Sequence, residues 1–358
     1  MKLKKKAKIT IIILVIAGVV LIGTSIIYIS SLRAVDKNSE ATYEIVVEQG
    51  MSTRQIGDLL EKRGIIRSSK IFLIYTKLNS CKSLKASTYN LSKSMDMKEV
   101  VKTICSGNNY NSNVVRITFK EGKRITDYAK LISEKLSLNY DDVINTMNDT
   151  NYLKSLQSDY WFLENDIFKQ GIYYPLEGYL APDTYEFIKT SDVKEIVEVM
   201  LDQTAKNLEP YRKKITSGSR SIHDYMTLAS MAELEGVNSL DRKMIVGVFN
   251  NRLLSNMNLG SDVTTYYAFQ KPMTADLTAK EFATSNTYNT RASDMAGKLP
   301  IGPICSVSKT SIEAAINPKN NNYYYFVADK NGKIYYNKTN SEHLATVKEI
   351  KEAGNWIW

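Results

Sequence analysis

Histidine and cysteine are scarce in this chain, whose 358 residues include two histidines and three cysteines. Cys81, Cys105 and Cys305 form no Cys-x-x-Cys pair and no cluster with His223 or His343. Structural zinc sites use four such ligands, typically in closely spaced pairs, so we expect neither a metal nor another cofactor. A Ser-His-Asp or Cys-His site would need one of the two histidines, and no serine lies in a Gly-x-Ser-x-Gly motif. These absences argue against metalloenzymes and against serine or cysteine hydrolases.

Acidic residues are absent before Asp36, whereas lysines occupy positions 2, 4, 5, 6 and 8. An uncharged run at 9–29 follows, close to the ~20 residues that a bilayer-spanning helix needs. We expect a cytoplasmic tail at 1–8, a single membrane anchor at 9–31 and, by the positive-inside rule, an extracellular C-terminal part. The alternative is a cleaved signal peptide, whose apolar core would be only about 7–15 residues and end at a small-x-small site. The stretch 30–32 is a poor match for such a site.

Basic charge is concentrated in the same N-terminal segment. The formal net charge is +9, and the five lysines and Arg33 supply six of these charges, so the part beyond residue 33 carries +3. Nucleic-acid-binding proteins concentrate much more basic charge on one face. We therefore expect no nucleic acid among the partners.

The odd number of cysteines bears on the expected extracellular part. An oxidising environment allows one disulfide among three cysteines and leaves one thiol over. The sequence does not decide whether Cys81 and Cys105 form that disulfide.

The fold class expected beyond the anchor is α+β, in two parts. Residues 32–42 are polar and predict a tether. Alternating β-branched residues and capped apolar stretches then predict strand, helix, helix, strand and a further helix, and we assign residues 43–118 to a small α+β module. The predicted elements of this module are 43–47, 52–63, 69–79, 88–91 and 97–105, with a polar linker at 108–113.

Residues 119–358 predict a second, mixed α+β domain. A strand–glycine–helix unit at 114–137 repeats the layout of the module, and internal duplication and the common use of this unit both remain open. Tyr323–Ala328 and Lys333–Asn337 predict a hairpin across Asn331-Gly332, a strong turn signal. The predicted helices are 139–170, 192–213, 222–235, 239–256, part of 276–288 and 308–316.

Two carboxylates, Glu233 and Glu235, end the apolar helix before Gly236. Two residues along a helix are about 200° apart around its axis, so the two side chains cannot share a face and should have different roles. A helix C-terminus disfavours a carboxylate and raises its pKa, as a general acid working near neutral pH requires. A glutamate on a helix is most often solvated or salt-bridged, so position alone does not make Glu235 catalytic.

Blocks in a fixed order connect this helix to a known family. ASMAELEGV, VFNNRL and MNLGSDVTTYYA follow one another between residues 229 and 268. The other blocks are EGYLAPDTYEF at 177–187, NTYNT at 286–290, LPIGPICSVSKTSIEAAINP at 299–318 and YYYFVADKNGKIYYNKTNSEH at 323–343. Together they resemble the MltG-like (YceG-like) endolytic murein transglycosylases over nearly the whole chain after the anchor. The module at 43–118 resembles the LysM-like domain of that family.

The resemblance implies roles for particular residues. The second acid of the family's Glu-x-Glu motif falls on Glu235, the implied catalytic acid, which leaves Glu233 as a supporting or structural acid. The positions implied to bind substrate are Glu233, Asn251, Arg252, Ser261, Asp262, Thr264, Tyr288 and Asn289. The chain departs from the family pattern at Gly236, where threonine is common, at Gly260, where glutamine is usual, and at Val263, where proline is frequent.

The resemblance also implies a reaction. A lytic transglycosylase cuts the MurNAc–GlcNAc β-1,4 bond of peptidoglycan with one acid and closes a 1,6-anhydro ring on MurNAc. A hydrolase would need a second carboxylate, such as Glu233 or Asp262, and a non-catalytic wall-binding scaffold is the other alternative. A membrane-tethered enzyme reaches newly made glycan strands, so wall synthases or division and elongation proteins are the expected protein partners.

Overall fold

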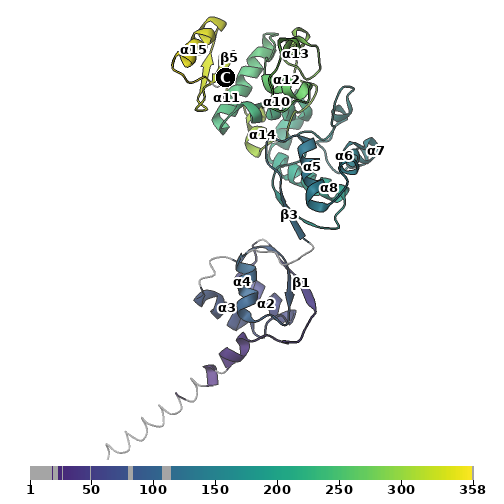
Figure 1. Ribbon diagram of the computed structural model, residues 1–358, viewed down its shortest axis with the longest axis vertical. Helices are drawn as coiled ribbons and strands as arrows, with labels where there is room; N and C mark the ends of the chain where they lie inside the picture. Colours follow the sequence, from purple (N-terminus) through teal and green to yellow (C-terminus); the bar gives the residue numbers. More distant parts are fainter. Residues whose placement is uncertain are drawn as a thin grey trace, which may run out of the picture. The chain divides into compact units, whose positions relative to one another are not determined.

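The computed structural model describes residues 18, 23–25, 27–48, 50–79, 84–106 and 114–356. The chain forms two compact units, Met1–Val114 and Val115–Trp358, each of which contains helices and strands (Figure 1). The expected mixed α+β character is therefore confirmed. Most of the predicted anchor at 9–31, and the whole linker at 108–113, lie outside the described residues. Among the helices that are described, none combines the length and hydropathy that crossing a bilayer requires.

The first unit has the predicted order of elements. These are β1 (Thr42–Val47), α2 (Thr53–Lys62), α3 (Ser69–Leu78), β2 (Ser87–Ser92) and α4 (Met97–Ser106). Strands β1 and β2 are antiparallel, with Thr42 opposite Ser92 and Val47 opposite Ser87. A capping box starts α2, because Ser52 and Gln55 each accept a hydrogen bond from the other's backbone N–H.

A small apolar core closes this unit. It includes Ile45 of β1, Leu60 of α2, Phe72 of α3, Leu91 of β2 and Val100 of α4, each at most 1% exposed. All five elements thus contribute to one core. Cys105 is disulfide-bonded, whereas Cys81 lies outside the described residues and Cys305, in the second unit, is a buried free thiol.

The second unit begins with a strand that the sequence analysis placed in the module at 43–118. This strand, β3 (Val114–Thr118), pairs with β4 (Thr184–Ile188). The connection between them contains α5 (Ile125–Leu136), α6 (Tyr140–Asn148), α7 (Thr150–Leu156) and η1 (Asn165–Phe168). The stretch predicted as helical at 139–170 is therefore three separate pieces, because Asp149 ends α6 and caps α7 through Asn151 N and Tyr152 N.

The helix predicted at 192–213 is also interrupted. Helix α8 (Val193–Leu208) gives way to the 3-10 turn η2 (Glu209–Tyr211) and then to α9 (Arg212–Thr216). Pro210 lies in that turn. A proline has no backbone N–H to donate and its ring clashes with the preceding turn, so the α-helix cannot continue through it.

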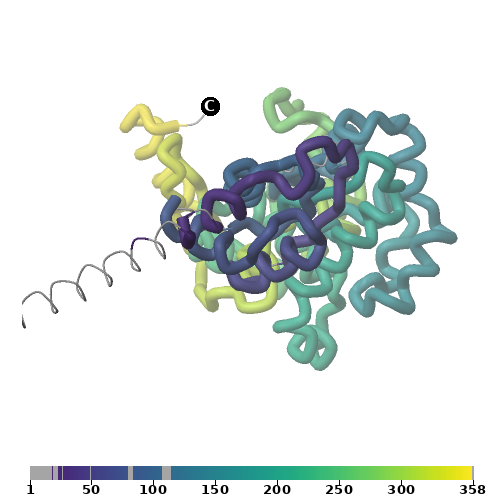
Figure 2. Tube along the Cα trace, turned by 90° about the horizontal axis from the view of Figure 1, so that it is seen from below, coloured from purple at the N-terminus to yellow at the C-terminus, as the bar shows by residue number. Residues whose placement is uncertain are grey.

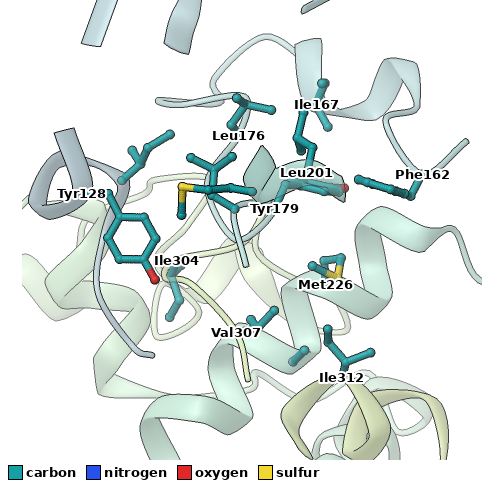
Figure 3. Packing of buried hydrophobic residues seen from close by; sticks show 14 of the residues in the cluster. Tyr128, Phe162, Ile167, Leu176, Tyr179, Leu201, Met226, Ile304, Val307 and Ile312 are labelled. Atoms are coloured by element: carbon teal, nitrogen blue, oxygen red, sulfur yellow. The ribbon is translucent and has the colours of Figure 1, made fainter. Parts of the chain in front are cut away.

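Helix α10 (Ile222–Glu235) lies at the centre of the second unit. It packs against α11 (Ser239–Leu254), α12 (Asp262–Ala268) and α14 (Lys309–Ile316), as Figure 1 shows. Figure 3 shows Met226 of α10 among buried side chains from distant segments, including Tyr179, Leu201 and Ile312. Ser230 ties the helix to a loop by accepting a hydrogen bond from Ile304 N at 3.0 Å. The end of α10 is therefore held in place on several sides.

The predicted hairpin is confirmed. Strands β5 (Tyr325–Ala328) and β6 (Ile334–Asn337) are antiparallel, with Ala328 opposite Ile334. Gly332 adopts a φ of +78°, which a side chain would strain, and Asp329 accepts hydrogen bonds from Asn331 N and Lys333 N. Helix α15 (Asn340–Glu352) packs on both strands. Two further short helices, α13 (Ala279–Ala283) and η3 (Ser293–Met295), lie in the loops after α12.

Candidate active site

Glu235 is the last residue of α10. The helix starts at the cap Ser221, whose side chain accepts from Asp224 N, and stops at Gly236, whose backbone is extended. A Cβ on Gly236 would lie 2.6 Å from Cγ and 2.9 Å from the backbone N of Arg242. The absence of a side chain at Gly236 therefore lets α11 pass close to the end of α10.

The Glu235 side chain, half-buried, lines a cavity of about 1110 Å³. This cavity is lined by the end of α10, by Arg252 of α11 and by the loop that leads into α12. One wall comes from α12, α13 and the loops around them, and the other from β5, α15 and Trp356. In Figure 2 the yellow hairpin and α15 stand apart from the green loop that carries α13. Residues from both of these parts of the unit line the cavity, together with the Glu235 carboxyl group.

The surroundings of Glu235 favour its protonated form. Burial is the main cause that raises the pKa of this carboxyl, and the nearby Asp262 adds to the effect. A hydrogen bond from Ser261 Oγ, 2.5 Å from Oε1, opposes it, as do the charges of Arg291 and Arg252. The direction agrees with the sequence prediction, although burial rather than the end of the helix is the leading cause.

Ser261 and Thr264 have different positions. Ser261 contacts Glu235 directly, and its backbone N–H donates to Thr290 Oγ1 at 3.0 Å. Thr264 is fully buried behind it, where its hydroxyl donates to Ser261 O at 2.7 Å. The structure thus brings Ser261, predicted to bind substrate, to the acid itself, and makes Thr264 a support for Ser261 rather than a cavity-lining residue.

Asp262 and Arg252 both line the cavity, as predicted. Asp262 forms an ion pair with Arg291, whose guanidinium also lies over the Phe282 ring at 5.0 Å. Arg252 donates to Tyr324 O and to Leu259 O at 2.5 Å each. These hydrogen bonds fix the Arg252 guanidinium beside the acid, where burial lowers its pKa.

Glu233 and Asn251 do not reach this cavity. Glu233 pairs with Arg242 at 2.8 Å and accepts from Ser308 N and Oγ at 2.8 and 2.6 Å. Its carboxylate borders a separate cavity of about 680 Å³. The Asn251 amide donates to Asn321 O and Tyr323 O at 3.0 and 2.8 Å, which fastens the start of the hairpin to α11. Both residues thus hold the fold together instead of lining the cavity at Glu235.

Tyr288 and Asn289 also lie behind the cavity rather than in it. Tyr288 is fully buried, with its ring centroid 4.8 Å from those of Tyr173 and Tyr267. Asn289 is buried and donates to the carbonyls of residues 281, 282 and 284. It therefore positions α13, which presents Phe282 to the cavity. The prediction that these two side chains line the groove differs from what the structure shows.

Several cavity-lining residues were not predicted from the sequence, among them Arg291, Phe282, Tyr325 and His343. Arg291 directly follows the NTYNT block, and Tyr325 and His343 lie within the last block, so proximity to the motifs was an available signal. Phe282 carried no such signal, because it comes from a short helix outside every block.

The chain is similar to known proteins along most of its length. A family profile described as the YceG-like family matches residues 45–349. The chain is 33% identical over 332 residues to the endolytic murein transglycosylase of Bacillus subtilis, covering 92% of this chain and 89% of that protein. It is 31% identical to the endolytic murein transglycosylase of Streptococcus pneumoniae D39 over 90% of this chain, which spans 60% of the longer pneumococcal protein.

A solved structure matches as well. The crystal structure of a putative yceG-like protein from Listeria monocytogenes is 33% identical, with a TM-score of 0.61, and covers 86% of this chain and 100% of that one. The family profile spans most of the chain, and the relatives match along nearly all of it. The chain therefore belongs to the YceG-like family.

Proposed function

We propose that this chain is an endolytic peptidoglycan lytic transglycosylase that cleaves the MurNAc–GlcNAc β-1,4 bond and leaves 1,6-anhydro-MurNAc ends. The observation that carries the proposal is Glu235, a carboxyl with a raised pKa that lines the large cavity. The names of the relatives in Bacillus subtilis and Streptococcus pneumoniae support the same activity.

Glu235 acts first as an acid and then as a base. Its carboxyl proton passes to the glycosidic oxygen while the bond from that oxygen to C1 of MurNAc breaks. The resulting carboxylate removes the proton from the C6 hydroxyl of the same sugar, and O6 bonds to C1. The same carboxyl group thus donates one proton and takes one back, and no water is consumed. The hydrogen bond from Ser261 holds Oε1 in place and stabilises the carboxylate that forms midway.

The other acids near the site favour this one-carboxylate reaction over hydrolysis. A glycosidase needs a second free carboxylate about 5–9.5 Å from the first. Of the two acids proposed for that role, Glu233 is bound by Arg242 and Ser308 beside another cavity, and Asp262 is neutralised by Arg291. Neither has the environment of a nucleophile or of a base for water.

We further propose that residues 9–31 anchor the chain in the cell membrane, with residues 32–358 outside. The tether at 32–42 would keep the catalytic unit near newly made strands, so that it releases or shortens nascent glycan beside the wall synthases. Full cellular function from a secreted form that lacks the anchor would contradict this. Activity on isolated wall without a cellular effect from the same form would support it.

The first unit has the strand–helix–helix–strand order expected for a LysM-like module, and we propose that it helps to hold glycan. Deletion of residues 43–114 should weaken binding to purified wall while the cut ends keep their chemistry. Unchanged wall binding would refute this role.

The test of the activity is digestion of purified peptidoglycan by the full chain in detergent, with Glu235→Gln in parallel, followed by mass spectrometry of the ends. Anhydro-MurNAc ends made by the wild type and lost in the variant would support the proposal. Reducing ends would mean hydrolysis, and binding without cleavage by either protein would indicate a scaffold.

A further inference from the structure

His343 of α15 lines the same cavity as Glu235 but comes from the opposite wall. Its imidazole stacks on the Tyr325 ring, with centroids 5.5 Å apart and planes 27° apart. Helix α15 is tied to the hairpin, because Asn337 Nδ2 donates to Thr346 Oγ1 at 3.0 Å. The orientation of the imidazole is therefore set by the wall itself and does not depend on a ligand.

The two ring nitrogens of His343 differ in what surrounds them. Nδ1 is buried and has no hydrogen-bond partner within the described part of the chain. A proton on Nδ1 would leave a buried donor unpaired, which destabilises that tautomer. The Nε2–H tautomer leaves only an acceptor lone pair unmatched at Nδ1, so we take Nε2 as the protonated nitrogen that meets a ligand. Burial, and then the charge of Arg252, lower the pKa of the ring, which favours this neutral form.

Apolar side chains lie on one side of His343. Val347, one turn further along the same face of α15, lines the cavity together with Val327, Ala328 and Trp356. Asn340 lies one turn earlier on that face and lines the cavity too. An imidazole N–H donor beside apolar side chains and an amide side chain matches an acetamido group, whose carbonyl accepts, whose N–H donates and whose methyl is apolar.

The architecture of α15 supports a role beyond packing. Of its thirteen residues only Ile350 is buried, so the helix adds little to the core of the unit. The face that it turns to the cavity carries Asn340, His343 and Val347. A helix whose burial does little for stability is well placed to serve a ligand.

We propose that His343 is a substrate-positioning residue, whose Nε2–H donates to the carbonyl oxygen of an N-acetyl group on the glycan bound in the cavity of Glu235. This inference rests on the proposed function and narrows it, because it makes N-acetylation of the strand a requirement for efficient cleavage. De-N-acetylated sugar replaces the amide with an amine, which offers no carbonyl to this donor.

The experiment pairs a change in the enzyme with the matching change in the substrate. His343→Phe keeps a ring to stack on Tyr325 but removes the donor, while His343→Gln keeps an N–H. The full-length wild type and both variants are assayed on N-acetylated and on chemically de-N-acetylated glycan, with anhydro ends counted by mass spectrometry and the melting temperature recorded.

On acetylated glycan we expect His343→Phe to lower kcat/KM about 5- to 30-fold, mainly through KM, and His343→Gln to recover part of the loss. The wild type and His343→Phe should cleave de-N-acetylated glycan at similar rates, because the group that His343 contacts is gone. The melting temperatures should stay alike.

Two results would overturn the inference. One is an equal loss of kcat/KM in His343→Phe on both substrates, since a purely structural role would lower the rate on both. The other is no loss at all while the wild type makes anhydro ends. If the wild type makes no cut in acetylated glycan, the proposed function fails, and this inference fails with it.

Discussion

Replacing each acid of the Glu-x-Glu motif by glutamine should separate stability from catalysis. Glu233→Gln breaks the ion pair with Arg242, in which the two side chains are 5% and 16% exposed and the charged atoms are 2.8 Å apart. Removing one partner of a buried ion pair leaves the other charge uncompensated and costs about 3–5 kcal/mol. Glutamine still accepts one hydrogen bond from Ser308, so we expect a loss near the lower end of this range.

This loss translates into a measurable change in melting temperature. Each kcal/mol shifts the melting temperature of a 150–250-residue domain by about 2–4 °C, and the second unit spans Val115–Trp358. We therefore expect Glu233→Gln to melt about 6–12 °C below the wild type by calorimetry. Below that temperature it should still make anhydro ends at a rate close to that of the wild type.

Glu235→Gln is the matched control, with the opposite outcome. Loss of a general acid lowers the rate about 10²–10⁴-fold. The melting temperature should stay the same or rise, because burial disfavours the charged form of this side chain. The reasoning would be refuted if Glu233→Gln lost activity at an unchanged melting temperature, since Glu233 would then act in the chemistry and a two-carboxylate reaction would return.

Three further predictions concern charge and space near the site. Asp262→Asn should move the alkaline limb of the kcat/KM–pH profile to lower pH, because Asp262 raises the pKa of Glu235. Arg291→Gln should move the same limb to higher pH, because Arg291 lowers that pKa. Shifts of both variants in the same direction would contradict this. Burial raises the pKa of Glu177 to about 8, so its ionised form is disfavoured in the folded state. The unfolded chain releases this proton at lower pH than the folded chain does. The wild type should therefore lose stability relative to Glu177→Gln as the pH rises from about 5 to 8. A melting-temperature difference that stays constant over that range would disprove it. Gly236→Thr should destabilise the fold by about 1–3 kcal/mol in chemical denaturation, because its Cβ has no room, and an unchanged midpoint would show that α11 yields easily.

The sequence predicted helix α10 well for physical reasons. Its apolar content and its stop at Gly236 define α10, and the 200° between Glu233 and Glu235 implies two environments. The structure bears this out, because the two carboxylates border different cavities. The single helix predicted at 192–213 was wrong at Pro210, because proline cannot continue an α-helix.

The walls of the cavity were harder to predict, because they depend on contacts between distant segments. Motif membership does not tell a side chain that lines a cavity from one that supports the lining, so Thr264 and Asn289 were assigned to the groove although they lie behind it. Phe282 and His343 reach the cavity only because the loops and the hairpin dock around α10 and α11. No local pattern in the sequence encodes that docking.

The way in which the hairpin is attached also bears on its motion. Side chains of Asn251 and Arg252 bond to carbonyls at its start, while α15 buries only Ile350. Segments with few buried apolar contacts unfold locally at a lower free energy than core helices do. Amide hydrogens of α15 should therefore exchange with solvent sooner than those of α10, nine of whose residues are buried. For an enzyme that cuts within a strand, such local opening would let a long polymer enter sideways, without threading from an end.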